Sequence, residues 1–170
     1  MSEPLTSGDI CGPFDPAFAS VAGQAAPPSP PRRRRAPRTF YLAASSADPS
    51  AVARKMREVE ALGLTCSMDW TTVLDSPEQE WPQLALVDER ATCASDLFVV
   101  VLADLPSHGA MFELGARIGF GREAHLVGRQ WHLFHRHPRI TWHASWGEFL
   151  LWLGQQVERR PGLPAEASTG

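Results

Sequence analysis

The stretch that most constrains the fold is a strand-like sequence at residues 96–102, which is apolar from Leu97 onward. A short apolar run without alternation is typical of a strand buried on both faces, as in a parallel sheet. A loop containing Pro, Ser and Gly follows, and then a helix is expected at residues 109–119 that carries the carboxylate of Glu113. In open α/β sheets, ligands bind at the carboxyl ends of the strands, where such loops lie. The stretch therefore predicts a parallel α/β protein with Glu113 near its ligand site.

Strand-like runs and helix-like periodicities alternate along the rest of this region. Four further strands are expected at residues 40–44, 64–70, 125–127 and 139–142. Three further helices are expected, and the first runs from Pro49 to Gly63. The second has Ser76 as its N-cap and Pro77 as its first residue, and it ends near Ala94. The third is capped by Ser145. This alternation predicts a three-layer, flavodoxin-like (Rossmann-like) parallel α/β sheet of about five strands with helices on both faces.

The two ends of the chain have a different composition from the predicted domain, which spans residues 39–158. Residues 1–38 are rich in Pro and contain the run Arg32–Arg35. Proline fixes φ and removes backbone donors, so we expect a disordered tail there. Residues 159–170 are small and polar, and they are expected to form a flexible tail.

Charge and cysteine content narrow the possible classes of protein. A net charge of −3 disfavours nucleic-acid binding, except through the tail that contains Arg32–Arg35. The alternative is that this basic run is a solvated linker. No apolar run approaches the ~20 residues that span a bilayer, and no secretory signal is evident. Three cysteines at unrelated spacings (Cys11, Cys66 and Cys93) favour neither a disulfide framework nor a zinc site. We expect a reduced, cytoplasmic protein without membrane contact.

Three acidic residues surround the strand at residues 96–102. Asp88 lies on the helix before it, Asp96 starts it, and Glu113 lies on the helix after it. If Asp88 and Glu113 both project toward the carboxyl end of the strand, they share one pocket. Paired carboxylates cleave glycosidic bonds, one attacking or stabilising the sugar carbon while the other handles protons. The alternative is that both are ordinary surface charges.

The order and spacing of these residues resemble the nucleoside 2-deoxyribosyltransferase superfamily, and most closely the 2'-deoxynucleoside 5'-phosphate N-hydrolases. Tyr41 matches a Tyr that the family carries near the end of the first strand. Asp88 stands eight residues before Asp96, and Ser107 stands six residues before Glu113 in a Ser-x-Gly-x-x-x-Glu-Leu-Gly motif. The similarity covers about residues 39–153. It implies an N-glycosidase or a 2-deoxyribosyltransferase that needs neither metal nor organic cofactor.

The resemblance also implies roles for single residues. Glu113 matches the nucleophile that attacks C1' of the deoxyribose, and covalent catalysis splits the departure of the base into two easier steps. Asp88 matches the proton-handling carboxylate at the departing base. Tyr41 matches a phenol that orients the catalytic Glu, although a buried aromatic at a strand end has the same sequence signature.

Substrate binding is expected at the loops around these three residues, namely at Ser107, Gly109, Ser45, Ser46 and Asp104. Serine at position 107 suits a 5'-phosphate, because a hydroxyl can donate where a carboxylate would repel, and it also suits a helix cap. The hydrolases of this superfamily carry a Gly-rich loop with an Arg for the phosphate after the first strand, whereas the loop at residues 43–48 lacks both residue types. The transferases instead carry an Asp that holds a free 5'-hydroxyl, and Asp104 can take its place. A 5'-phosphate and a free 5'-hydroxyl therefore both remain open.

Two further expectations concern metals and partners. Five histidines fall within nineteen residues but spread over two strands and a loop, so no metal site is expected: His125, His132, His135, His137 and His143. The loop at residues 131–135 is expected to pack over the base pocket or at a dimer contact. The resemblance implies a homo-oligomer.

Two rival functions remain open at this point. One is a glycosidase of ribonucleotides or NAD-like dinucleotides on a similar fold. The other is a non-catalytic nucleotide-binding module in which Glu113 holds a ribose hydroxyl.

Overall fold

The computed structural model describes residues 36–102, 107–130 and 133–158. Its strands are β1 (Thr39–Ala43), β2 (Thr65–Cys66), β3 (Leu97–Val101), β4 (Ala124–Val127) and β5 (Ile140–His143). Its α-helices are α1 (Pro49–Ala61), α2 (Trp81–Ala94), α3 (His108–Gly119) and α4 (Trp146–Glu158). The predictions for Asp104, for the tail at residues 1–35 and for residues 159–170 lie outside the described residues.

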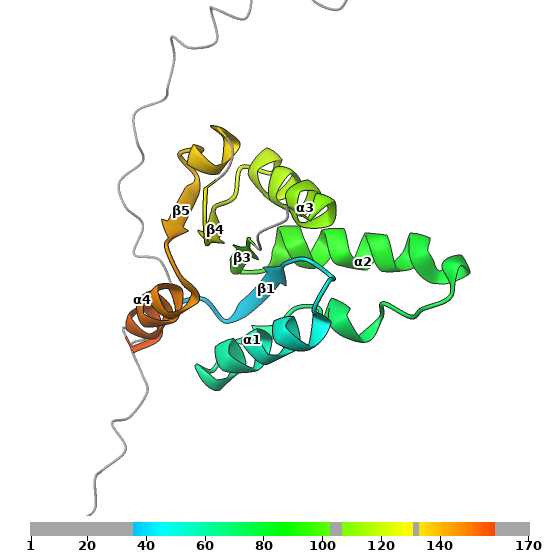
Figure 1. Cartoon of the computed structure of the whole chain (residues 1–170), viewed down its shortest axis with the longest axis horizontal. Helices are drawn as coiled ribbons and strands as arrows, with labels where there is room; N and C mark the ends of the chain where they lie inside the picture. Colours follow the sequence, from blue (N-terminus) through cyan, green and yellow to red (C-terminus); the bar gives the residue numbers. More distant parts are fainter. Residues whose placement is uncertain (1–35, 103–106, 131–132, 159–170) are drawn as a thin grey trace, which may run out of the picture. The chain divides into compact units, whose positions relative to one another are not determined.

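All strand pairs are parallel, and the five strands lie in the order β2-β1-β3-β4-β5. This is the flavodoxin-like order, and it confirms the predicted fold class. Helices α1 and α4 cover one face of the sheet, whereas α2 and α3 cover the other (Figure 1). Among the described residues, no helix has the length and apolar character to cross a membrane.

Alternating residues of β1 divide the core between the two faces. Phe40 and Leu42 pack with α1 and α4, whereas Tyr41 and Ala43 pack with α2 and α3. All four side chains are fully buried. Because successive side chains of a strand point to opposite faces, one five-residue strand builds both cores.

The helix expected from Pro49 and the capping of the helix after the central strand by Ser107 are confirmed. The Asp48 carboxylate accepts a hydrogen bond from the backbone N–H of Ala51 at 2.9 Å, and Pro49 is the first residue of α1. The Ser107 hydroxyl accepts one from the backbone N–H of Ala110 at 3.4 Å. These N-caps satisfy backbone donors that have no partner inside the helix.

Two predicted elements are shorter than expected. The strand expected at residues 64–70 is reduced to β2, because the chain turns into the 3-10 helix η2 (Trp70–Thr72), whose N-cap is Asp69. The helix expected from Ser76 begins instead at Trp81, after a separate 3-10 turn, and Ser76 is not its cap. Proline stands at the second position of α2, where the missing N–H costs nothing.

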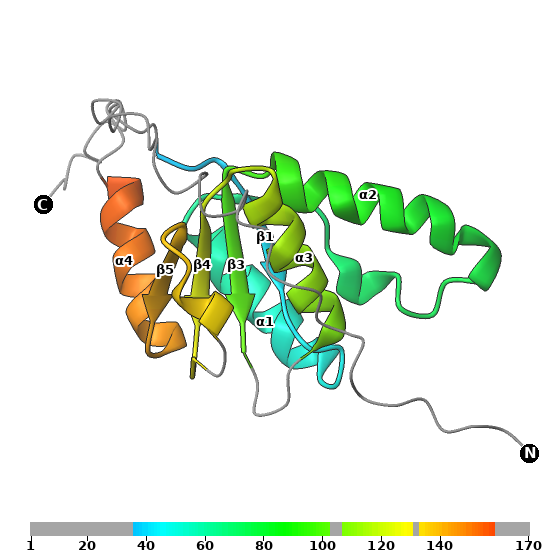
Figure 2. The same ribbon diagram turned by 90° about the horizontal axis from the view of Figure 1, so that it is seen from above.

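The buried Arg117 side chain on α3 fixes the carboxyl-terminal end of α2. Its guanidinium donates hydrogen bonds to the carbonyl oxygens of Thr92, Cys93 and Ser95 at 2.9, 3.1 and 2.9 Å. The only buried residues of α2 are Ala91 and Thr92, near this end. The amino-terminal half of α2 projects beyond the sheet (Figure 2).

Candidate functional site

Three side chains from three elements meet on the α2/α3 face of the sheet: Tyr41 of β1, Asp88 of α2 and Glu113 of α3. The Tyr41 hydroxyl is hydrogen-bonded to Asp88 and lies 3.0 Å from Oε1 of Glu113. We call these three residues the acid cluster. Tyr41 and Glu113, which are 72 positions apart in the sequence, thus come together as the resemblance implies.

If both carboxyl groups are ionised, the acid cluster lacks one of the two hydrogen atoms that its two hydrogen bonds require. A phenol carries a single O–H, so Tyr41 can fully donate to only one of its two carboxyl neighbours. A proton on Glu113 or Asp88 supplies the second hydrogen bond. The geometry therefore favours a state in which the two carboxyl groups share one proton.

Electrostatics lead to the same protonation state. Burial is the largest cause of the raised pKa of Glu113, and repulsion by the nearby Asp88 carboxylate adds to it, bringing the pKa to about 8. Burial, together with the charges of Glu113 and Asp88, also raises the pKa of Tyr41 far above its ordinary value, so the phenol keeps its proton. Near neutral pH the acid cluster holds an extra proton.

Asp88 and Glu113 line a cavity of about 440 Å³ next to the carboxyl ends of β1 and β3. Ser46, Ser107 and Gly109 also line it. The remaining lining residues are apolar: Ala44, Met68, Trp70, Val73, Leu74, Trp81, Leu84, Ala85 and Ala110. A cavity lined by a few polar groups and many apolar side chains suits an amphipathic small molecule.

The structure separates the residues expected to bind substrate into two groups. Ser107, Gly109 and Ser46 line the cavity, as described above. Ser45 is not among the lining residues, and its hydroxyl accepts a hydrogen bond from the backbone N–H of Ala47 at 3.2 Å.

Asp96 belongs to the opposite end of the sheet from the acid cluster. Its Oδ2 accepts hydrogen bonds from the backbone N–H groups of Arg38 and Thr39 at 2.9 and 3.1 Å. These bonds tie the start of β1 to the start of β3. Of the three acidic residues around the central strand, Asp96 therefore has a structural role.

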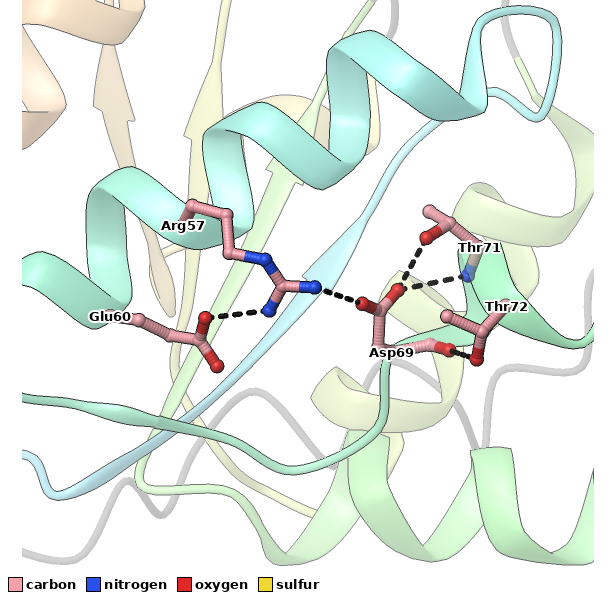
Figure 3. A network of polar contacts seen from close by, with 5 residues as sticks. All are labelled: Arg57, Glu60, Asp69, Thr71 and Thr72. Carbon is pink, nitrogen blue, oxygen red and sulfur yellow. Dashed lines mark hydrogen bonds and ion pairs between the residues drawn. The ribbon is translucent and has the colours of Figure 1, made fainter.

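The turn after β2 supplies a cavity wall that sequence reasoning missed. Asp69 accepts hydrogen bonds from Arg57 Nη2 at 3.1 Å and from the backbone N–H of Thr71 at 3.2 Å (Figure 3). The neighbouring Trp70 donates its indole N–H to the carbonyl oxygen of Leu42 at 2.8 Å. These bonds hold Trp70 and Met68 against the cavity.

The other missed wall had a sequence signal. Trp81, Leu84 and Ala85 lie seven, four and three residues before Asp88 and line the cavity with it. These spacings place side chains on one face of a helix. The position of Asp88 on its helix would have been enough to predict this wall.

The histidines do not form a metal centre in the described part of the chain, where no group of three or more potential ligands comes together. His125 and His143 form a buried pair, with Nδ1 and Nε2 3.0 Å apart, and both pack against Phe149 on the opposite face of the sheet from the acid cluster. The turn Leu133–Arg136 contributes no residue to the cavity, so packing over the pocket is not observed for its described residues. A dimer contact there stays a prediction.

Comparison with solved structures finds two similar proteins. A 2-deoxyribosyltransferase from Bacillus psychrosaccharolyticus is similar with a TM-score of 0.56 and 20% identity, over 66% of this chain and 90% of that chain. The CMP N-glycosidase BcmB from Clostridium botulinum has a TM-score of 0.49 and 18% identity, over 68% of this chain and 98% of that chain. No protein-family model and no curated protein matches the sequence. The first likeness establishes a shared fold.

Proposed function

We propose that this protein is an enzyme of the nucleoside 2-deoxyribosyltransferase superfamily. It cleaves or transfers the N-glycosidic bond of a 2'-deoxynucleoside or its 5'-monophosphate, with Glu113 as the nucleophile. The observation that carries this proposal is the acid cluster, which brings Tyr41, Asp88 and Glu113 together beside one cavity. The fold shared with a 2-deoxyribosyltransferase supports it.

The chemistry proceeds in two steps. A carboxylate oxygen of Glu113 forms a bond to C1' while the C1'–N bond breaks, and its electron pair passes to the base nitrogen. Asp88 gives a proton to the departing base, which therefore leaves as a neutral molecule. In the second step, water or an acceptor base gives a proton to the Asp88 carboxylate and attacks C1', while the C1'–O bond to Glu113 breaks and Glu113 leaves as a carboxylate.

The proton that the two carboxyl groups share in the free protein is the one that the departing base takes up in this reaction. In the free protein, Glu113 holds the proton because burial and Asp88 raise its pKa to about 8. A nucleophile must be ionised, so the proton passes to Asp88 when the substrate enters, and from there to the base. Tyr41 keeps the two carboxyl groups in register during this transfer, because its hydroxyl contacts both.

The 5' end of the sugar is assigned to the end of the cavity that Ser46 and Ser107 line. The nearby start of α3 adds the positive end of a helix dipole. Neutral hydroxyl donors can hold either a 5'-hydroxyl or a 5'-phosphate, so the substrate panel must contain both.

The direct test replaces Glu113 by Gln and measures release of free base from deoxynucleosides, deoxynucleotides and their ribo forms. We expect the rate to fall by at least about 10³-fold, because the covalent path is lost. Glu89→Gln, an exposed change on α2, is the matched control and should keep full activity.

A mass increase of one deoxyribosyl unit on the Glu113 peptide of the quenched wild-type enzyme would identify the intermediate. Equal rates in wild type and Glu113→Gln would remove the nucleophile assignment. Equal cleavage of ribo and deoxy substrates would favour the ribonucleotide glycosidase instead. Tight binding of intact nucleotide without base release would favour the non-catalytic module.

A further inference from the structure

One face of α2 carries the acid and the apolar wall together. Trp81, Leu84, Ala85 and Asp88 all line the cavity and follow the helical period. At about 1.5 Å per residue, Trp81 lies roughly 10 Å along the helix axis from Asp88. The wall therefore begins at the proposed proton donor and runs outward for about the length of a heteroaromatic base and its substituents.

The facing wall is apolar as well. Met68, Trp70, Val73 and Leu74 come from the segment between β2 and α2. The indole N–H of Trp70 donates to the carbonyl oxygen of Leu42 at 2.8 Å, and that of Trp81 donates to the carbonyl oxygen of Ser76 at 3.1 Å. Each indole has one N–H group, and in both residues it is hydrogen-bonded to the backbone. The indoles can therefore contact a ligand only through their π-systems.

The wall is open to solvent without a ligand. Trp81 is 55% exposed and Leu74 is 44% exposed, although both line the cavity. Covering such apolar surface is favourable, because it removes hydrocarbon from water. A planar, neutral ring seated here gains stacking and burial without needing hydrogen-bond partners on the wall.

We infer that this apolar chamber, formed by Trp81, Leu84, Trp70, Met68 and Leu74, is the leaving-group subsite, and that it selects the base by stacking area. The inference rests on the proposed function and deepens it. Asp88 lines the same cavity as these residues, so it contacts the base at the nitrogen or oxygen that takes up the proton. The other edges of the base meet hydrocarbon and aromatic rings.

This arrangement predicts a characteristic specificity. A site that reads the edges of its ligand with hydrogen bonds rejects analogues by about 10⁴–10⁵-fold, whereas an apolar pocket separates similar ligands by about 10²-fold or less. We expect purine substrates to exceed pyrimidine substrates in kcat/KM, because they stack over a larger area. Adenine, guanine and hypoxanthine substrates should lie within about 10²-fold of one another.

The experiment compares kcat/KM for purine and pyrimidine deoxynucleosides in wild type, Trp81→Ala and Trp81→Phe. Trp81→Ala should lower the purine to pyrimidine ratio by about tenfold or more, mainly through KM, and Trp81→Phe should restore most of it. Leu86→Ala is the matched control, because Leu86 lies on α2, is 45% exposed and does not line the cavity. An unchanged ratio in Trp81→Ala would overturn the inference.

Binding of free bases separates this inference from the proposed function. Calorimetric titration of adenine and cytosine into wild type and Trp81→Ala needs no turnover. If no substrate is cleaved but adenine binds more tightly than cytosine in a Trp81-dependent way, the subsite stands and the proposed reaction fails. If cleavage persists while Trp81→Ala alters only the oligomeric state, the subsite fails and the reaction stands.

Discussion

The two faces of the sheet differ in what their cores contain. The α1/α4 face is closed by hydrocarbon and aromatic side chains, with Phe149 and Leu153 fully buried. The α2/α3 face contains the Tyr41 hydroxyl and two carboxyl groups, and it opens into a cavity. Neighbouring residues of β1 serve both faces. A single strand can therefore stabilise the fold on one side and carry chemistry on the other.

The difference also appears in the helices. Helix α1 buries three residues spread along its length, Val52, Met56 and Val59. Helix α2 is of similar length, but only Ala91 and Thr92 are buried, and Leu86 and Val87 are exposed. The α1/α4 face should thus dominate stability, whereas the α2/α3 face should dominate activity.

The largest expected effect on stability comes from Phe149→Ala on the α1/α4 face. Removing a fully buried aromatic ring should lower the free energy of unfolding by about 3–5 kcal/mol. Chemical denaturation measures the change. Leu151→Ala on the same helix is the control, because Leu151 is 73% exposed and should change stability by less than about 0.5 kcal/mol. A specific loss of base release from fully folded Phe149→Ala protein would show that the two faces are coupled.

Tyr41→Phe tests the α2/α3 face, where we expect a large effect on activity and a small effect on stability. The ring stays packed against Phe98, so the free energy of unfolding should change by less than about 1.5 kcal/mol. The hydroxyl that contacts both carboxyl groups is lost, and base release should fall by about 10–100-fold. Parallel denaturation and kinetic measurements separate the two effects. Full activity in Tyr41→Phe would reduce Tyr41 to a packing residue.

The third comparison is a pH dependence of stability that has opposite signs on the two faces. The folded protein holds the Glu113 proton up to about pH 8, whereas its ordinary pKa is 4.5. The contribution of Glu113 to stability therefore falls as pH rises between these values, by at most about 1.4 kcal/mol per pH unit. Burial lowers the pKa of His143 below its ordinary 6.5, so its contribution is lost as pH falls below about 6.5.

Differences between variants isolate the two contributions. Urea denaturation from pH 5 to pH 8.5 should show Glu113→Gln gaining stability over wild type as pH rises. His143→Gln should gain relative to wild type as pH falls. The same sign of slope in both comparisons would contradict the assignment of a buried acid to one face and a buried neutral imidazole to the other.

Local signals in the sequence explain why most of the fold was predictable. The signals for a buried strand followed by a capped helix lie in neighbouring residues of the sequence, as they do for β3 with α3 and for β1 with α1. The start of α2 was misplaced because Ser76 and Pro77 look like a helix start, whereas the chain first forms a separate 3-10 turn. The early end of β2 was missed because Asp69 caps η2 and is held by Arg57 of α1, twelve residues away.

The candidate site was partly predictable for the same reason. Asp88 and Glu113 lie on the helices that flank one strand, so their approach follows from parallel topology. Trp70 reaches the cavity through a bond to Leu42, a contact set by tertiary structure alone. The pairing of His125 with His143 depends on the register of β4 and β5, in which His125 stands opposite Thr141 rather than His143.

The hydrogen bonds from Arg117 anchor α2 at its carboxyl-terminal end only. Asp88 lies seven residues closer to the anchored end than Trp81, whose indole N–H donates to the carbonyl oxygen of Ser76 at the other end. For any given bend of the helix, the other end travels much further than the anchored one. We therefore expect a larger ring to displace Trp81 more than it changes the distance between Asp88 and Glu113.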